Sequence, residues 1–320
     1  MELSVIYVNW NSLDYLRESI VSVYEHTRGL TFEIVVVDNA STEPGIETVA
    51  HEFPAVILVK SDRNLGFAGA NNLGFEHSRG NFVLLLNPDT KLIGPSINVM
   101  MDHIRSLPDA GIVGCKLLNT DGSVQLSSIQ KFPTILNQAI DAEYLRLRWP
   151  HCRLWEIAPL FANDVKVMKV DVIPGACTLL RRQVFREVGL YSEDYFMYAE
   201  DLDLNYKLKR AGFKNYYVGE TAIIHHGGGS SSRQKISHWA TIMKYRAMLL
   251  LFRKNRSRAY GYAYRMAMGA VATGRMLLLL LLFAVDKILW KKDTLRFSLT
   301  KWKAVWMWAV GLQRLALQER

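Results

Sequence analysis

The stretch EIVVVDNAST, residues 33–42, decides the fold class of this chain. Its first half is a short continuous apolar run rich in β-branched residues, which is typical of a strand buried on both faces. Asp38 follows directly where this strand ends. Ser41 and Thr42 then supply hydroxyl groups that cap helices, so we expect a helix from here to about Glu52. The stretch therefore predicts a strand–helix unit with polar residues at the carboxyl end of the strand.

The same alternation continues on both sides of this stretch. Continuous apolar strands separated by helices indicate an α/β fold, with a parallel sheet covered on both faces. Further strands are predicted at 3–8, 56–59, 82–86, 170–173 and 216–224, and one more runs from the turn at Pro174-Gly175 to Leu180. Further helices are predicted at 11–26, 68–78 and 182–188.

Polar residues stand at the carboxyl ends of the predicted strands. Asn9 follows the first strand, Asp38 and Asn39 the second, and Asn87-Pro88-Asp89 the fourth. Ligands of open α/β sheets bind outside these ends. No G-x-G-x-x-G follows the first strand and no P-loop occurs, so neither a dinucleotide fold nor a P-loop NTPase is indicated. Two structural alternatives stay open, a helix cap at Asp38 and an ordinary turn at 87–89.

A second informative segment, residues 196–232, reads FMYAEDLDLNYKLKRAGFKNYYVGETAIIHHGGGSSS. Its acid pair, Glu200 and Asp201, begins an amphipathic helix that Gly212 is placed to end. An ionised carboxylate can serve as a general base, and the helix dipole at this end is expected to keep Asp201 charged. A solvated acidic helix start is the alternative, and for Glu200 it stays equally open.

The same segment supplies two adjacent histidines. The predicted strand at 216–224 leads into His225 and His226, and either imidazole could bind a metal ion. A histidine pair satisfied by ordinary hydrogen bonds is the alternative. The glycines that follow, Gly227–Gly229, are compatible with a lid over a ligand or with a solvated turn. Gly175 is likewise compatible with a close approach of an acceptor or with a tight turn.

The net charge of +9 on the 320 residues is divided unevenly. Residues 1–232 hold 21 basic and 27 acidic side chains, whereas residues 233–320 hold 18 basic and 3 acidic ones. Such a basic tail favours nucleic acid or anionic lipid as a partner. Three widely spaced cysteines and a short N-terminal apolar run indicate neither a disulfide framework nor a signal peptide, so we expect a reducing compartment.

The apolar content of the tail favours lipid over nucleic acid. Residues 266–285 form an apolar window broken only by Arg275, and Trp290 and Trp302 lie among lysines, which is typical of a membrane interface. A spanning helix would place Arg275 near the bilayer centre at a cost of roughly 2.5–3.5 kcal/mol. We therefore expect helices that lie in or dip into the cytoplasmic leaflet. A basic helical hairpin packed on the body or on a partner subunit is the alternative.

Four motifs in this order resemble those of a family 2 glycosyltransferase of the GT-A fold, in particular the bacterial rhamnosyltransferase-like group that builds lipid-linked surface polysaccharides. They are VVVDNAST (35–42), DRNLGFAGANNLG (62–74), LLLNPDT (84–90) and segment 196–232. The resemblance implies a GT-A domain at 1–232, with a nucleotide-sugar-binding half at 1–115 and an acceptor and catalytic half at 116–232. Residues 233–320 are expected to form a basic, Trp-rich, amphipathic helical region that associates with the membrane.

The resemblance also implies roles for single residues. Asp38 would bind the pyrimidine base of a nucleotide sugar, with further donor contacts from its neighbours. The metal-binding D-x-D of the family is reduced here to N-P-D, which leaves Asp89 as the ligand of a divalent cation, Mg²⁺ or Mn²⁺. His225, which ends its strand 24 residues after Asp201, is expected to complete the metal site, with His226 as runner-up. Asp201 is the predicted catalytic base, supported by Glu200. The other predicted donor-binding residues are Asn9, Asn39, Arg63, Asn64, Gly66, Asn71 and Asn87.

The implied activity is an inverting, metal-dependent, non-processive transfer of a sugar, with rhamnose as the first candidate. The expected donor is a dTDP- or UDP-sugar, and the acceptor a polyprenyl-diphosphate-linked glycan at the cytoplasmic face of the bacterial inner membrane. We expect a peripheral or monotopic protein on an anionic membrane surface that binds no nucleic acid, with a homo-oligomer and a monomer both left open. Another NDP-hexose transferase, a processive synthase or an inactive nucleotide-binding scaffold are the alternatives. A processive synthase usually carries Q-x-x-R-W, which this sequence lacks.

Overall fold

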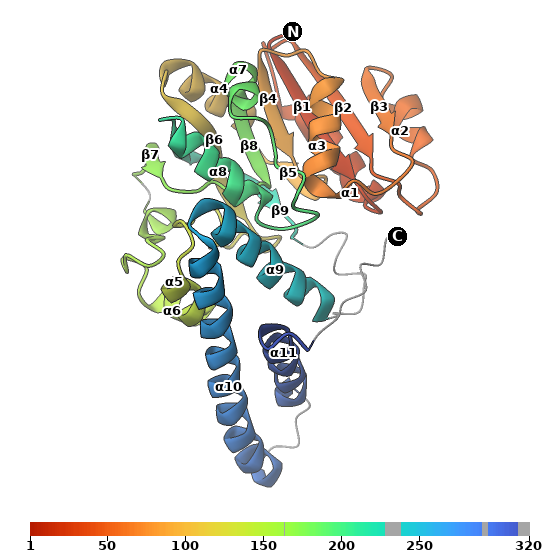
Figure 1. Ribbon diagram of the computed structural model, residues 1–320. Helices are drawn as coiled ribbons and strands as arrows, with labels where there is room; N and C mark the ends of the chain where they lie inside the picture. Colours follow the sequence, from red (N-terminus) through yellow and green to blue (C-terminus); the bar gives the residue numbers. More distant parts are fainter. Residues whose placement is uncertain (163, 228–237, 290–293, 313–320) are drawn as a thin grey trace. The chain divides into compact units, whose positions relative to one another are not determined.

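The computed structural model describes residues 1–162, 164–227, 238–289 and 294–312. Gly228, Gly229 and Trp290, on which two of the expectations fall, lie outside the described residues. The chain forms two compact units, each described here by itself (Figure 1). Unit 1 comprises Met1–Phe132, Ala142–Phe196 and Glu200–Gln234, and unit 2 comprises Pro133–Asp141, Met197–Ala199 and Lys235–Arg320.

Unit 1 is built on one mixed sheet with the strand order β3-β2-β1-β4-β8-β6-β9-β5, and β7 pairs with β9. Strands β1 to β4 pair in parallel, as predicted, whereas β8 runs antiparallel to β4 and to β6, so the sheet as a whole is not parallel. The strands are β1 Leu3–Asn9, β2 Phe32–Asp38, β3 Val56–Lys60, β4 Phe82–Leu86, β5 Thr90–Leu92, β6 Ala110–Leu118, β7 Val167–Val170, β8 Cys177–Arg181 and β9 Lys214–His225.

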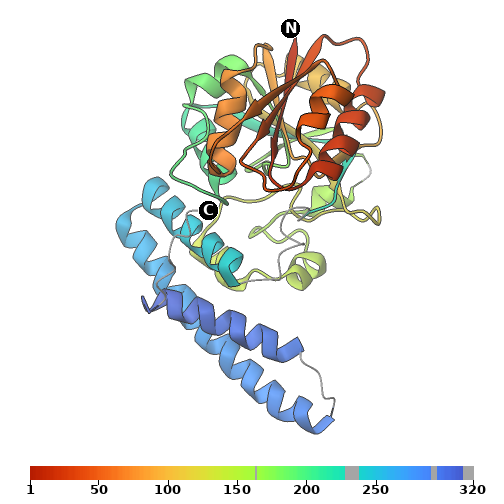
Figure 2. The ribbon, with the colours of Figure 1, turned by 90° about the vertical axis from the view of Figure 1, so that its right-hand side faces the viewer.

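Helices cover both faces of the sheet, which confirms the predicted layering (Figure 2). Leu16 of α1 and Met100 of α4 are buried in one core with alternate strand residues such as Val5. On the other face α3 packs so closely that a Cβ at Gly74 would lie 2.5 Å from Cγ2 of Ile6. The helices of unit 1 are α1 Leu13–His26, α2 Glu47–Glu52, α3 Gly66–Glu76, α4 Ser96–Ser106, α6 Glu143–Arg148, the 3₁₀ helix Ala158–Phe161, α7 Arg182–Glu187 and α8 Glu200–Arg210.

Helix α2 begins at Glu47, so the expected cap at Ser41 and Thr42 is wrong. The hydroxyl of Ser41 instead accepts hydrogen bonds from the Asn9 side chain and the Asn11 backbone. The side-chain oxygen of Asn11 accepts a hydrogen bond from the Thr42 N–H at 2.8 Å. These contacts engage the two hydroxyl-bearing residues with the end of β1, so neither is available to begin a helix.

The strand expected at 170–173 also differs, because β7 ends at Val170. Val172 leaves the sheet and forms an isolated bridge with Gln130. Helix α4 and strands β5 and β6 were not predicted. By contrast, Gly212 follows α8 with a φ of +89°, the left-handed conformation expected of a helix-ending glycine.

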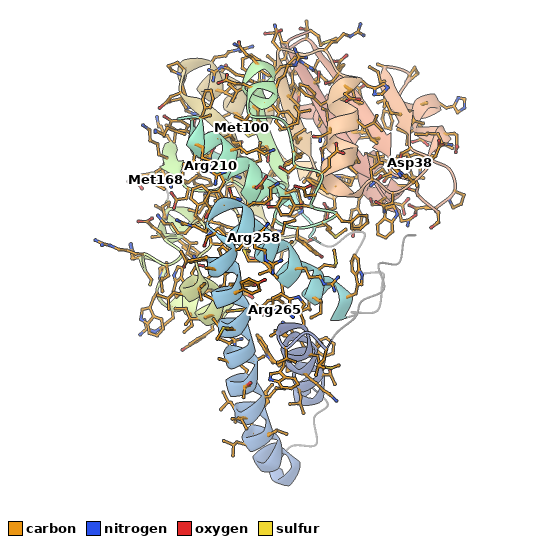
Figure 3. The ribbon with its side chains drawn as sticks, viewed as in Figure 1. Asp38, Met100, Met168, Arg210, Arg258 and Arg265 are labelled. Carbon is orange, nitrogen blue, oxygen red and sulfur yellow. The ribbon has the colours of Figure 1, made fainter. Side chains whose placement is uncertain are left out.

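Unit 2 is helical, and its helices pack on a core that includes Phe252, Tyr264 and Trp308. Arg265 donates hydrogen bonds to the carbonyls of Trp308 and Ala309 and so caps the end of α11 (Figure 3). The helices are α5 Ile135–Ile140, α9 His238–Asn255, α10 Arg258–Leu289 and α11 Thr294–Ala309.

Candidate active site

The acid pair stands at the start of α8, as predicted. The two carboxylate oxygens of Asp201 accept hydrogen bonds from the backbone N–H groups of Leu202, at 2.8 Å, and Gly175, at 3.2 Å. Glu200 is only 7% exposed, and its Oε2 has no hydrogen-bond partner among the described residues. The residues immediately before the pair, Tyr198 and Ala199, both have positive φ angles, a strained conformation that functional sites often hold.

Burial dominates the protonation of this pair. It raises the pKa of Glu200 to about 8, and the neighbouring charge of Asp201 adds to the effect. Burial also raises the pKa of Asp201, while the N–H groups of Leu202 and Gly175 act in the opposite direction. The helix terminus is therefore not the only influence on Asp201, because desolvation acts against it and is the larger effect. That Asp201 is charged at neutral pH stays a prediction.

The raised pKa of Glu200 predicts a pH-dependent stability. Between pH 4.5 and about 8 the native carboxyl keeps a proton that the unfolded chain releases, so the free energy of unfolding falls as the pH rises. Glu200→Gln removes this group. We compare the free energy of unfolding of the variant with that of the wild type at each pH. The variant's advantage should be at least about 1.4 kcal/mol larger at pH 8.5 than at pH 5, which is the equivalent of one pKa unit.

Urea unfolding at both pH values measures this difference. Glu76→Gln, at an exposed position on α3, is the matched control and should show no such gain. Parallel stability curves for the wild type and Glu200→Gln would contradict the prediction.

Asp89 and His225 are brought together by the pairing of β5 with β9, in which Thr90 lies opposite His225. Oδ1 of Asp89 lies 3.4 Å from Nε2 of His225. The Asn87 amide is 3.5 Å from the same ring nitrogen, and its Oδ1 is buried with no hydrogen-bond partner among the described residues. No group of three His, Cys, Asp or Glu side chains suited to a metal ion occurs among the described residues.

A carboxylate and an imidazole nevertheless face each other at this point, with the amide nitrogen of Asn87 beside them. Oxygen and imidazole ligands suit Mg²⁺ and Mn²⁺, so the residues present fit a divalent cation. Asn87, expected among the donor-binding residues, therefore lies next to this pair.

His226 has other partners. Its Nδ1 is 3.0 Å from the hydroxyl of Thr120, and its Nε2 is 4.0 Å from the carboxylate of Glu18. Its ring also packs against Tyr15, with the ring centroids 5.0 Å apart. Of the two histidines, His225 is therefore the one whose ring nitrogen faces Asp89.

Two consecutive residues connect the acid pair to the loop that carries Asn87 and Asp89. The N–H of Gly175 binds Asp201, and the carbonyl of Ala176 accepts a hydrogen bond from the N–H of Asn87 at 3.0 Å. The candidate base and the candidate cation site thus flank one dipeptide at the start of β8.

Most of the predicted donor-binding residues fall into two groups. Asn9 and Asp38 lie side by side at the ends of β1 and β2, and the Asn9 amide donates to the Asp38 carboxylate at 3.3 Å. Asn39 instead organises the loop before α3, since its side chain donates to Asn64 and Gly66 and accepts from the Leu65 N–H.

The remaining two candidates differ in exposure. Arg63 is exposed to solvent. Asn71 is 2% exposed, and its side chain donates to the carbonyl of Phe67 one helical turn earlier.

Gly66 has a structural role that sequence reasoning missed. Its φ is +72°, and a Cβ at this position would lie 2.3 Å from the carbonyl oxygen of Phe196. The N–H of Phe67 donates to the same oxygen at 3.1 Å. The donor-side motif at 62–74 is therefore fastened to the backbone just before the acid pair, and only glycine leaves room for the crossing.

Asn72 was also missed. Its amide donates to the carbonyl of Tyr191 and to Glu193, and its oxygen accepts from the Tyr191 N–H. This side chain ties α3 to the segment that leads into the acid pair. Asn72 looks like any other polar residue of the predicted helix at 68–78, so no local signal in the sequence marks it.

Comparison with known proteins identifies the enzyme class. Residues 4–189 match the sequence profile of glycosyl transferase family 2. The chain belongs to this family. It is 32% identical over 219 residues to an N-acetylglucosaminyl-diphospho-decaprenol L-rhamnosyltransferase of Mycobacterium tuberculosis, covering 65% of this chain and 70% of the relative. It is 24% identical over 255 residues to the rhamnosyltransferase WbbL of Escherichia coli, covering 73% of this chain and 88% of the relative.

The fold agrees with this family assignment. The mannosyltransferase PcManGT of Pyrobaculum calidifontis, solved with GDP-Man and Mn²⁺, has a TM-score of 0.59 at 17% identity and covers 97% of this chain and 86% of its own. The mixed sheet of this family 2 glycosyltransferase thus has the GT-A fold. The predicted family, fold and enzyme class are confirmed.

Proposed function

We propose that this glycosyltransferase is an inverting, non-processive and cation-dependent rhamnosyltransferase. It transfers rhamnose from dTDP-rhamnose to a polyprenyl-diphosphate-linked sugar during synthesis of a bacterial surface polysaccharide. The observation that carries the proposal is the placement of Asp201 and the Asp89–His225 pair on either side of Gly175 and Ala176. The rhamnosyltransferases among its relatives, one of them named for a diphospho-decaprenol acceptor, support the choice of substrates.

In this reaction Asp201 accepts the proton of the acceptor hydroxyl. The hydroxyl oxygen forms a bond to the anomeric carbon while the bond from that carbon to the diphosphate breaks, so the nucleoside diphosphate leaves and the configuration inverts. Asp89 and His225 would hold the divalent cation, which would supply positive charge to the departing diphosphate. Asp38, oriented by Asn9, accepts the N–H of the pyrimidine base.

A transfer assay with purified protein tests this function. Nucleotide sugars are offered one at a time with N-acetylglucosaminyl-diphospho-polyprenol as acceptor. We expect one rhamnose per acceptor, with inverted anomeric configuration and only with dTDP-rhamnose. Addition of several sugars to one acceptor would support a processive synthase instead. No transfer from any nucleotide sugar would support the inactive scaffold.

The cation site predicts unequal roles for the two adjacent histidines. His225→Gln should lower the affinity for Mn²⁺ and the rate of transfer by about 10- to 100-fold, because it removes the imidazole that faces Asp89. His226→Gln is the matched control and should keep both values within about threefold of the wild type. Titration with Mn²⁺ after treatment with a chelator measures the affinity. The reverse order of the two variants would contradict the assignment.

We further propose that α10 of unit 2 binds the cytoplasmic leaflet of the membrane that carries the acceptor. Among the described residues, Arg258–Leu282 is the helix long and apolar enough to cross a bilayer, with a mean hydropathy of 1.5. Leu278 and Leu281 are 56% and 69% exposed, although both are leucines. Arg275 is held within unit 2, 4.5 Å from the Trp302 ring and 3.4 Å from the Asp141 carbonyl.

These contacts support a monotopic arrangement. Arg275 is fixed to unit 2, so only the leucines beyond it are free to enter lipid. The apolar run beyond Arg275 continues to Val285 in the sequence, and its ten residues span about 15 Å of helix, which matches one leaflet and not a full bilayer.

A double substitution, Leu278→Gln with Leu281→Gln, tests this arrangement. We expect at least about a tenfold loss of binding to anionic liposomes, since burial of one leucine is worth roughly 1.5–3 kcal/mol. Met266→Gln, at an exposed position earlier on α10, is the control and should bind like the wild type. Flotation of the protein with liposomes measures the binding, and flotation unaffected by the double substitution would contradict the proposal.

A further inference from the structure

We propose that Gln125 is a positioning residue that sets the tautomer of His225 and so directs the lone pair of its Nε2 at the cation. The inference rests on the proposed function in one respect only, the presence of a divalent cation at Asp89 and His225. Gln125 lies in the irregular segment that follows β6, outside every motif of the family resemblance.

The side chain of Gln125 contacts His225 at two points. Its Oε1 lies 3.0 Å from Nδ1 of the ring, and its Nε2 donates to the backbone carbonyl of the same histidine. The backbone of Gln125 is itself fixed, because its N–H donates to Leu117 of β6 and its carbonyl accepts from the N–H and the hydroxyl of Ser128. The backbone that carries this side chain is therefore held in place by hydrogen bonds at both its N–H and its carbonyl.

The two contacts together determine the orientation of the amide. The NH₂ group must face the His225 carbonyl, because the reverse orientation would place two acceptor oxygens against each other. The amide oxygen is then the atom that faces Nδ1. An amide oxygen only accepts hydrogen bonds, so Nδ1 carries the proton and, in the neutral ring, Nε2 keeps its lone pair.

The lone pair selected in this way points at the candidate cation site. Nε2 is the ring atom 3.4 Å from Oδ1 of Asp89, and its lone pair also faces the NH₂ group of Asn87, a donor 3.5 Å away. Metal-binding histidines commonly donate their other ring N–H to a fixed acceptor, which sets both the tautomer and the ring orientation. Gln125 supplies that acceptor here.

The neighbouring histidine lacks this device. Nδ1 of His226 faces the hydroxyl of Thr120, and a hydroxyl can either donate or accept. That contact is compatible with both tautomers of His226. The difference in their partners thus gives a physical reason why the first histidine of the pair, and not the second, is prepared for a cation.

The tautomer can be measured in the metal-free protein by NMR of ¹⁵N-labelled histidine rings, with the His225 signal identified by its loss in His225→Gln. We expect the Nδ1–H tautomer in the wild type. Gln125→Met should abolish this preference and lower the affinity for Mn²⁺, added alone, by about 10- to 100-fold. Gln125→Glu keeps an acceptor for Nδ1–H but loses the donor to the His225 carbonyl, so it should retain the tautomer, whereas Gln125→Met should not.

Gln130→Met, which alters a glutamine five residues further along the same segment, should change neither quantity. The proposal is overturned if Gln125→Met keeps the wild-type tautomer, whatever happens to the affinity, or if Gln125→Glu behaves like Gln125→Met. The tautomer is read without metal, donor or acceptor. Failure of the proposed transfer reaction is therefore distinguishable from failure of this inference.

Discussion

Asp201→Asn is expected to lower the rate of sugar transfer by about 10²- to 10⁴-fold, the usual contribution of a general base. The amide cannot take the proton of the acceptor hydroxyl, and its single oxygen can accept only one of the two hydrogen bonds that the Leu202 and Gly175 N–H groups give to the carboxylate. Some stability should therefore be lost, whereas the affinity for the nucleotide sugar should stay close to that of the wild type. Initial rates of transfer at saturating donor, with donor binding measured by calorimetry, separate these effects.

Two control variants sharpen this prediction. Asp194→Asn replaces an exposed carboxylate seven residues earlier and should transfer sugar at the wild-type rate. Asp203→Asn replaces a buried carboxylate that accepts hydrogen bonds from Ser192, at 2.6 Å, and Tyr195. It should cost stability, about 1–3 kcal/mol, more than it costs catalysis. A near-normal rate for Asp201→Asn would remove Asp201 as the base.

The parallel core of the fold was predictable because its signals are local. A strand buried on both faces needs a continuous apolar run, and β2 and β4 each supply one within a few residues. The short strand β5 has no such run. It forms because Thr90 to Leu92 pair with the end of β9, more than 130 positions away, and no local pattern records that pairing.

The same distinction separates the predicted from the unpredicted parts of the site. Asp201, Asp89 and His225 are conspicuous by residue type and by position at the ends of helices and strands. Gln125 contacts a histidine 100 positions away, and Asn72 contacts residues about 120 positions away. Their side chains are ordinary in sequence, and only the fold gives them partners.

The protonation of the acid pair depends on more than the helix terminus that the sequence reveals. A helix terminus can be inferred from a capping pattern, so the expectation for Asp201 considered only the dipole. Desolvation depends on what covers the carboxylates in three dimensions. Glu200 and Asp201 are covered enough for burial to outweigh the dipole, which raises both pKa values.

The second large effect is expected at Gly66. Gly66→Ala should destabilise unit 1 by at least about 2 kcal/mol, because it combines a left-handed backbone, worth roughly 1–2 kcal/mol for alanine, with a steric clash. The new Cβ would meet the Phe196 carbonyl at 2.3 Å, and that atom is backbone and cannot rotate away. Urea unfolding measures the loss of stability.

Gly212→Ala provides a matched control for the backbone conformation alone. Gly212 also has a positive φ, +89°, but a Cβ there would meet nothing within 4 Å. It should therefore lose only about 1–2 kcal/mol. The additional loss of unfolding free energy in Gly66→Ala then measures the steric clash with the Phe196 carbonyl. Equal losses in the two variants would show that this clash does not contribute to the destabilisation. Because Phe196 lies only four residues before Glu200, the displacement should reach the acid pair, and the Gly66→Ala protein that remains folded should transfer sugar more slowly than folded Gly212→Ala.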